Sequence, residues 1–155
     1  MFRVTREIHF CYGHRLLNYE GKCRRLHGHN GRGIITFQTS GLDHRGMVVD
    51  FAEIKRTISE WIDEQLDHRL LLCRDDPLVD PLRKLGEAPF VMDENPTAEN
   101  IARLIYEFTA SRGFPVAEVQ LWETPRCGAS YCPGDRDEST MISGRLKAEP
   151  LAQET

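Results

Sequence analysis

Two histidines separated by one glycine, His27-Gly28-His29, form the pattern in this sequence that most directly suggests chemistry. In an extended strand, residues two apart point to the same side, so both imidazoles would face one way. A third histidine, His14, follows the first strand-like segment, and a hairpin would bring it near this pair. Three neutral imidazoles at about 2.0–2.1 Å can hold Zn²⁺ and leave a fourth position open, as in catalytic zinc sites. The alternative for each histidine alone is an ordinary surface or core residue, because a His-x-His pair is a weak signal.

A cysteine lies within a strongly basic run, Lys22-Cys23-Arg24-Arg25. Neighbouring cations favour the thiolate form of a cysteine. A thiolate beside a metal-bound substrate is a plausible general base. The alternative is a small packing residue or an idle surface thiol, which is also the expectation for Cys11 and Cys73.

Two acidic residues stand where they could support the same chemistry. Asp67 precedes His68 just beyond a predicted helix, where its carboxylate could orient the imidazole for proton transfer to a thiol. The alternative is a histidine that interacts favourably with the end of the helix dipole. Glu123 continues the apolar face of a predicted strand, where a carboxylate is costly unless N–H donors of a ligand pair with it. The alternative for Glu123 is a position already past the end of the sheet, in water.

Strand and helix patterns follow one another in an order that could bring these residues together. The segment from Phe2 to Phe10 alternates apolar and polar residues, as a half-buried strand does, and a second strand candidate runs from His27 to Thr39. After a glycine-bounded loop, apolar residues recur every three or four positions between Phe51 and Leu66. This period predicts an amphipathic helix, with Asp50 as its N-cap.

The second half of the chain predicts one more helix and two more strands. The stretch from Cys73 to Pro96 contains four prolines and predicts a long irregular connection. A helix with inward apolar residues from Ile101 to Phe108 follows, with Asn95 or Thr97 as its cap. Strand patterns occupy residues 116–124 and 129–132. The order strand, strand, helix, helix, strand, strand predicts an α+β fold whose antiparallel sheet is covered on one side.

The composition limits the class of protein. The 155 residues include 20 Lys and Arg against 24 Asp and Glu, a formal net charge of −4, with 40% hydrophobic and 28% charged residues. This mixture is typical of a globular protein, and its acidity disfavours a general nucleic-acid binder. No apolar run approaches the roughly 18 residues of a membrane span, and charges interrupt the N-terminus where a signal peptide needs an apolar stretch. With an odd number of cysteines, these features predict a cytoplasmic protein with free thiols and no membrane partner.

Six short motifs follow one another along residues 1–133. They are Phe10-Cys11-Tyr12-Gly13-His14-Arg15-Leu16, Cys23-Arg24-Arg25-Leu26-His27-Gly28-His29-Asn30, Val49-Asp50-Phe51-Ala52-Glu53-Ile54-Lys55, Leu66-Asp67-His68, Asn95-Pro96-Thr97-Ala98-Glu99-Asn100 and Glu123-Thr124. In this order the chain resembles the 6-pyruvoyl-tetrahydropterin synthase family. The three-residue spacing between Cys23 and His27 is most similar to the bacterial 6-carboxytetrahydropterin synthase branch of the queuosine pathway.

The resemblance implies a zinc-dependent active site that binds a pterin. Its metal ligands would be His14, His27 and His29. Its proton-transfer residues would be Cys23, Asp67 and His68. Its substrate-binding residues would be Glu123, which would anchor the amino and ring N–H groups of the pterin, and Thr97 and Glu99.

The resemblance also implies a reaction and an assembly. The substrate would be 7,8-dihydroneopterin triphosphate, which a carbon–carbon lyase would convert to 6-carboxy-5,6,7,8-tetrahydropterin with release of acetaldehyde and triphosphate. Lys22, Arg24 and Arg25 would hold the triphosphate, or would be surface residues exposed to solvent. The fold would be the tunnelling fold (T-fold), in which antiparallel ββααββ units form a barrel with the helices outside. It would span residues 1–133 as a single domain, with 134–155 as a polar tail, and would assemble into a homohexamer of two trimers with sites at subunit interfaces.

Three alternatives and three departures accompany this interpretation. The alternatives are a 6-pyruvoyl-tetrahydropterin synthase, which eliminates triphosphate and retains the side chain, a non-catalytic pterin- or purine-binding paralogue, and a structural zinc module closed by Cys11 or Cys23. The departures are Gly31, where the family commonly has an aromatic residue, Cys11-Tyr12-Gly13, where small residues are usual, and the tail. The first two flank the metal motif, so they concern the identity of the substrate and product more than the metal.

Overall fold

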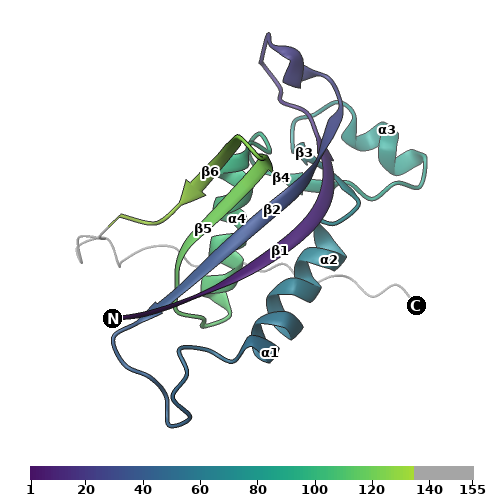
Figure 1. Cartoon of the computed structure of the whole chain (residues 1–155). Coiled ribbons are helices and arrows are strands. Elements are labelled where there is room, and N and C mark those ends of the chain that lie inside the picture. The colour runs from purple at the N-terminus through teal and green to yellow at the C-terminus, as the bar shows by residue number, and fades with distance from the viewer. Residues whose placement is uncertain (135–155) are drawn as a thin grey trace, which may run out of the picture.

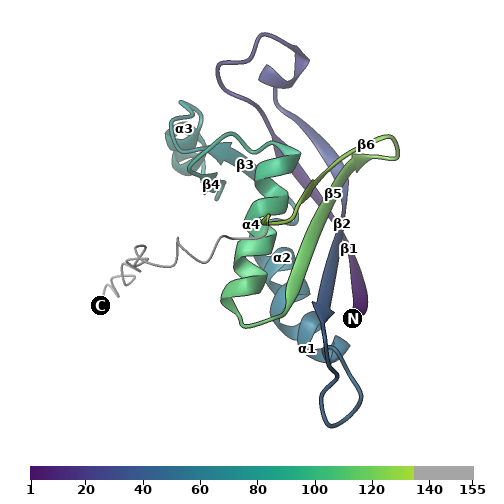
Figure 2. The same cartoon turned by 90° about the vertical axis from the view of Figure 1, so that its left-hand side faces the viewer.

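The computed structural model describes residues 1–134, which form a six-stranded sheet in the order β4-β3-β1-β2-β5-β6 (Figure 1). The strands are β1 (Phe2–His14), β2 (His27–Thr39), β3 (Arg69–Cys73), β4 (Phe90–Met92), β5 (Val116–Thr124) and β6 (Cys127–Tyr131). The helices are η1 (Lys22–Arg24), α1 (Phe51–Ile54), η2 (Lys55–Ser59), α2 (Glu60–Gln65), α3 (Val79–Lys84) and α4 (Ala98–Ser111). Figure 2 shows α2 and α4 on the same side of the sheet, so one face is covered by helices.

The centre of the sheet is the long antiparallel hairpin of β1 and β2. Its register runs from Phe2 opposite Thr39 to His14 opposite His27. Side chains alternate between the two faces, so Phe10, Tyr12 and His14 all point to the covered face and are buried. The same register brings the predicted histidine pair of β2 beside the end of β1, as the spacing predicts.

The covered face of the sheet and the two main helices share one hydrophobic core. Each helix contributes an apolar stripe at helical spacing, and Trp61 stacks on Phe108 with ring centroids 3.9 Å apart. The fully buried helix residues include Ile54, Ile58, Ile62, Ile101, Ala102 and Ile105. Both predicted N-caps are confirmed: the Asp50 side chain accepts a hydrogen bond from Ala52 N–H, and Thr97 accepts one from Asn100 N–H. The first helix is nevertheless interrupted by a π-helical turn, η2.

Two short strands depart from the predicted antiparallel sheet. β3 pairs with β1 in parallel, and β4 pairs with β3 in parallel, so the sheet is mixed. The segment from Cys73 to Pro96, predicted to be irregular, contains α3 and β4. The sequence predicts neither strand, because β3 has only five residues and begins with an arginine close after a helix, and β4 has only three residues. Neither is long enough to show a period of its own. The predicted α+β class and the order of the other elements are confirmed.

A buried ion pair ties the end of β1 to the segment after β3. Arg15 donates from Nε to the Asp76 carboxylate at 2.7 Å, and Leu78 N–H donates to the same carboxylate at 2.8 Å. Burial alone would raise the pKa of Asp76, but the hydrogen bonds from Arg15 and Leu78 outweigh it and hold the pKa below its usual value. The charged form of Asp76 is therefore stabilised by folding.

Replacing Asp76 with alanine is expected to lower the free energy of unfolding by about 2–4 kcal/mol, because Arg15 loses its buried partner. Since the folded-state pKa is lowered, this stabilisation is present above the ordinary aspartate value of about 4 and disappears as the pH falls through the folded-state pKa. Urea unfolding of wild type and Asp76→Ala across this pH range would measure the loss and its pH dependence. Asp93→Ala is the matched control, because Asp93 pairs with Arg74 with 80% of its side chain exposed. Equal losses in Asp76→Ala and Asp93→Ala would contradict the prediction.

Three further predictions concern the whole chain: the absence of a membrane span, the polar tail and the single domain. In the described part of the chain, no helix is long and apolar enough to cross a membrane. The polar tail predicted for 134–155 lies, apart from Gly134, outside the described residues. A single domain over 1–133 remains a prediction.

Candidate metal centre

Three histidines meet at one end of the central hairpin, on the face that the helices cover. His14 ends β1, and His27 and His29 begin β2. One ring nitrogen from each of the three lies within 4.8 Å of the others, and Nε2 of His14 is 3.1 Å from Nε2 of His27. His14 is 3% exposed. The hairpin therefore brings the three predicted metal ligands together.

Backbone carbonyls fix the orientation of two of these imidazoles. Nδ1 of His14 lies 2.7 Å from the Pro96 carbonyl oxygen, and Nδ1 of His27 lies 2.8 Å from the Arg25 carbonyl oxygen. A carbonyl only accepts, so in both rings Nδ1 carries the proton and Nε2 presents its lone pair. Burial is the main cause that lowers the pKa of His14 below its usual value, which keeps the ring neutral.

This donor arrangement fits a divalent metal ion. Two lone pairs that face one another at 3.1 Å repel unless a cation or a proton lies between them. In a tetrahedral site with bonds of about 2.0–2.1 Å, two ligand nitrogens lie about 3.3 Å apart. The observed separation is therefore close to that of two nitrogens on one zinc ion. A metal-binding histidine usually donates a hydrogen bond from the ring nitrogen that does not bind the metal, as Nδ1 of His14 and of His27 does here.

Glu123 of β5 borders the three histidines. Its Oε1 atom is 3.8 Å from Nε2 of His14 and 3.9 Å from Nε2 of His29. The Tyr12 hydroxyl donates to the same oxygen at 2.9 Å, and 22% of the Glu123 side chain is exposed. Burial and then the charge of Glu123 raise the pKa of Tyr12, so the hydroxyl keeps its proton. Glu123 is thus held at the edge of the cluster and has not passed into open water.

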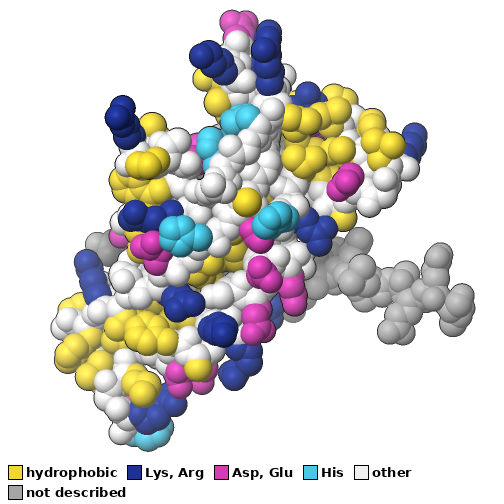
Figure 3. All heavy atoms as spheres, turned by 45° about the vertical axis from the view of Figure 1, so that its right-hand side comes forward, with side chains coloured by type: hydrophobic (Ala, Val, Ile, Leu, Met, Phe, Trp, Pro, Cys, Tyr) yellow, Lys and Arg dark blue, Asp and Glu magenta, His cyan; other side chains and the backbone are white. Residues whose placement is uncertain are grey.

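Two pockets reach the histidines from outside. One of about 560 Å³ is lined by residues that include Cys11, His27, His29 and His68. The other, of about 680 Å³, includes His29, Trp122 and Glu123. Figure 3 shows histidine side chains at the surface of the molecule around this end of the sheet. A small polar ligand can therefore approach both His29 and Glu123 from solvent.

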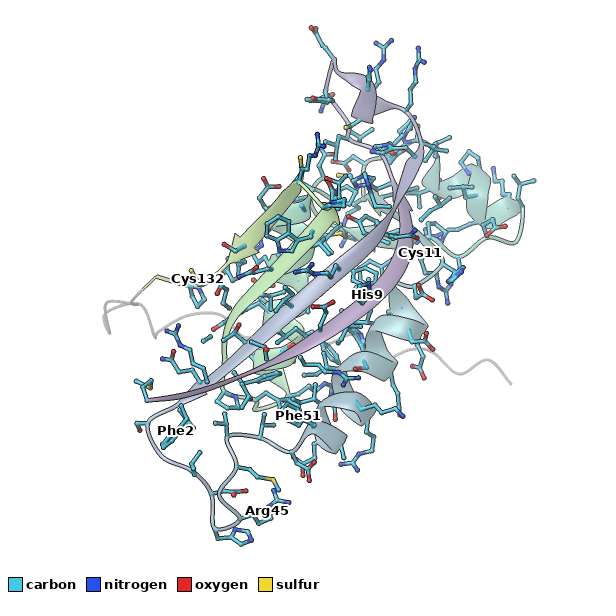
Figure 4. The ribbon with its side chains drawn as sticks, viewed as in Figure 1. Phe2, His9, Cys11, Arg45, Phe51 and Cys132 are labelled. Carbon is cyan, nitrogen blue, oxygen red and sulfur yellow. The ribbon has the colours of Figure 1, made fainter. Side chains whose placement is uncertain are left out.

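Asp67 and His68 form a second cluster, with Cys11. Nδ1 of His68 lies 2.6 Å from Oδ2 of Asp67, and the Cys11 N–H donates to Oδ1 of Asp67 at 2.6 Å. The His68 N–H donates to the Cys11 carbonyl at 2.7 Å, and His68 adopts a left-handed φ of 56°. Ligand-type atoms of these three residues lie within 4.8 Å of one another. Cys11, which Figure 4 labels, lies on β1. This strand therefore places a thiol beside the predicted pair of Asp67 and His68.

Cys23 lies on the projecting connection between β1 and β2, in η1 (Figure 1). Its carbonyl accepts a hydrogen bond from Leu16 N–H at 2.9 Å, and its side chain is half-buried between exposed Lys22 and Arg24. In the described part of one protomer, the thiol grouped with Asp67 and His68 is that of Cys11, and the group does not include Cys23. The predicted relay of Cys23, Asp67 and His68 is therefore not assembled within one chain.

The segment before α4 holds the other two predicted substrate residues. Thr97 caps α4, and Glu99 is exposed on its first turn. Their roles in pterin binding remain predictions. The neighbouring Pro96 carbonyl, which orients His14, was not identified from the sequence, because any residue offers a carbonyl. Tyr12 also received no role, although its alternation with buried Phe10 predicts that it faces the core.

Comparisons with known proteins find a family model and named relatives that match most of the chain. The family model for 6-pyruvoyl tetrahydropterin synthase matches residues 3–133. A protein of Rickettsia conorii named 6-carboxy-5,6,7,8-tetrahydropterin synthase is 38% identical over 134 residues, which cover 82% of this chain and 97% of the relative. One of the same name from Haemophilus influenzae is 30% identical over 142 residues, covering 85% and 97%.

Solved structures share the fold. An uncharacterized protein from Wolinella succinogenes matches with a TM-score of 0.71 and 29% identity, over 86% of this chain and 98% of that protein. The Caenorhabditis elegans 6-pyruvoyl tetrahydropterin synthase matches with a TM-score of 0.63 and 23% identity, over 86% and 96%, which supports the fold alone. The predicted T-fold class is confirmed. With its motifs, its sheet and its relatives in agreement, the chain belongs to the 6-pyruvoyl tetrahydropterin synthase family.

Proposed function

We propose that this protein is a zinc-dependent 6-carboxytetrahydropterin synthase. It converts 7,8-dihydroneopterin triphosphate and one water to 6-carboxy-5,6,7,8-tetrahydropterin, acetaldehyde and triphosphate, in queuosine biosynthesis in the cytoplasm. The observation that carries the proposal is the cluster of His14, His27 and His29 beside the Glu123 carboxylate. The 38% identity to a relative that bears this enzyme name supports the choice of reaction.

Each group at the site has a chemical task in this proposal. His14, His27 and His29 would hold the metal, with His14 and His27 presenting Nε2. Zinc bound there would supply Lewis-acid polarisation of the substrate side-chain oxygens. Glu123 accepts hydrogen bonds from the pterin N–H groups and so orients the ring, because a carboxylate pairs well with two adjacent donors. These contacts would hold the substrate side chain toward the histidines.

Proton transfer is assigned to Cys23, Asp67 and His68. Cys23 removes and returns protons at the substrate side chain, and Asp67 holds His68 in one tautomer, with 2.6 Å between Oδ2 and Nδ1. Because these residues are not grouped within one protomer, the relay is completed between protomers: Cys23 of one chain meets Asp67 and His68 of another. This requires an oligomer, proposed to be a homohexamer, in which the edge strands β4 and β6 are covered by neighbours.

The decisive experiment is turnover of 7,8-dihydroneopterin triphosphate by the purified zinc-loaded protein, with acetaldehyde as the product measured. Acetaldehyde release that ceases on zinc removal and returns on zinc addition is the expected result. Loss of triphosphate with retention of the three-carbon side chain would instead identify a 6-pyruvoyl-tetrahydropterin synthase. Tight pterin binding without any product would identify a non-catalytic paralogue, and either result would refute the proposal.

A further inference from the structure

The Tyr12 hydroxyl makes a buried contact with Glu123 that the proposed catalytic steps do not use. Tyr12 is 3% exposed and lies on β1 two residues before His14. Its hydroxyl donates to Oε1 of Glu123 at 2.9 Å, across the sheet from β1 to β5. Among the described residues 1–134, the Tyr12 hydroxyl is the hydrogen-bond donor to the Glu123 carboxylate. A fixed donor on one oxygen restricts rotation of the carboxylate, and it leaves Oε2 and the second lone pair of Oε1 available to the two N–H donors of a ligand.

The ring of Tyr12 is held in place by its neighbours. It contacts His14 edge-on with centroids 5.3 Å apart, and His29 at 5.9 Å. It also occupies the space beside Gly31, because a Cβ atom built on Gly31 would lie 2.9 Å from Cε1 of Tyr12. That separation is shorter than any real Cβ contact, so a side chain at position 31 must displace the ring. The absence of a side chain at Gly31 is therefore a condition for this position of Tyr12.

The position of the carboxylate matters for the chemistry beside it. Oε1 of Glu123 is 3.8 Å from Nε2 of His14 and 3.9 Å from Nε2 of His29, outside hydrogen-bonding distance of both. A glutamate free to rotate could move its oxygen toward these nitrogens or toward a metal on them. The Tyr12 hydroxyl opposes this movement, because its hydrogen bond to Oε1 is lost when the carboxylate rotates away.

We propose that Tyr12 is a positioning residue that fixes the Glu123 carboxylate for recognition of the pterin N–H edge, and that Gly31 provides the space for it. This inference rests on the proposed function. Tyr12 acts through Glu123 and does not itself touch the reacting atoms. Its contribution therefore lies in substrate binding, and the chemical step should be little affected by its loss.

Tyr12→Phe keeps the ring and removes only the hydroxyl. KM for 7,8-dihydroneopterin triphosphate is expected to rise about 10-fold or more, since a hydrogen bond to a charged group is lost, while kcat changes less than about threefold. The affinity for 7,8-dihydroneopterin, measured by calorimetry on the zinc-loaded protein, should fall by a similar factor. Tyr106→Phe is the matched control, because the Tyr106 hydroxyl is also partly buried but donates to the Val116 carbonyl at 3.2 Å. It should leave KM and affinity unchanged.

Gly31→Ala tests the same contact without altering Tyr12. Its Cβ would push the ring of Tyr12, so KM should rise in the wild-type background. In the Tyr12→Phe background the same substitution should add little, because the hydroxyl that it displaces is already absent. Additive effects of the two substitutions would show that Gly31 acts independently of the hydrogen bond, and would overturn the pairing.

The results separate this inference from the proposed function. If wild type turns over the substrate and Tyr12→Phe retains its KM and its pterin affinity, the positioning role is overturned while the enzyme assignment stands. A fall in kcat without a change in KM would equally overturn it, by assigning Tyr12 to the chemical step. If wild type neither binds the pterin nor turns it over, the proposed function fails and this inference fails with it.

Discussion

Cys23→Ala is expected to reduce kcat by about 10²–10⁴-fold, the usual contribution of a positioned general acid or base. KM should change much less, because Cys23, in η1, is assigned to proton transfer and pterin binding is assigned to Glu123. Steady-state kinetics at equal zinc content would measure the effect. Cys127→Ala is the matched control, because Cys127 is an exposed free thiol on β6. Unchanged kcat in Cys23→Ala would remove the proposed proton-transfer thiol.

Mixed oligomers test whether the relay crosses between chains. Cys23→Ala and His68→Ala, each inactive alone, are co-expressed with different tags and the doubly tagged oligomer is purified. If Cys23 of one chain works with His68 of another, about a quarter of the sites in a random mixture contain both residues, and activity returns. No recovery, together with loss of activity in Cys11→Ser, would contradict this. It would assign the relay to the Cys11, Asp67 and His68 cluster of a single chain.

His29→Ala is expected to remove the metal and to reduce activity to below about 1% of wild type, since one of three ligands is lost. The fold should persist, because the buried core that joins the helices to the sheet does not depend on a metal contact. His29 is the most suitable of the three ligands for this test, because 18% of its side chain is exposed, against 4% for His14. Metal content by mass spectrometry and thermal unfolding would be measured together.

His44→Ala is the control for the metal experiment, because His44 is exposed in the loop between β2 and α1. It should retain one zinc per chain and full activity. If His29→Ala also retains one tightly bound zinc per chain, the three-histidine site is wrong. A simultaneous loss of zinc and of cooperative unfolding would favour the structural zinc module instead.

The histidine cluster could be predicted from the sequence because it depends on local periods. Strand alternation places His27 and His29 on one face, and a simple hairpin brings His14 opposite His27. The position of Glu123 on the same face as buried Val119 and Leu121 follows from the same alternation along β5. These arguments need only the period of a strand and the pairing of sequential neighbours.

Contacts that depend on distant parts of the chain could not be predicted in this way. The parallel pairing of β3 with β1 joins segments more than fifty residues apart, and it brings Asp67 beside Cys11. No run of cations surrounds Cys11 as one surrounds Cys23, so the sequence predicts Cys23 as the reactive thiol. The sequence shows Tyr12 as a departure from the family pattern, but its hydrogen bond to Glu123 depends on the placement of β1 and β5 in one sheet.

The oxygens that orient His14 and His27 belong to the main chain, at Pro96 and Arg25. Every amino acid carries such an oxygen, so a mutation at position 25 can change the side chain without taking away the acceptor. The orientation of the two imidazoles therefore tolerates side-chain substitutions at these positions. It is sensitive mainly to changes in the course of the backbone. Insertions or deletions in the segments before His27 and before α4 should therefore harm the centre more than point substitutions at the two acceptor positions do.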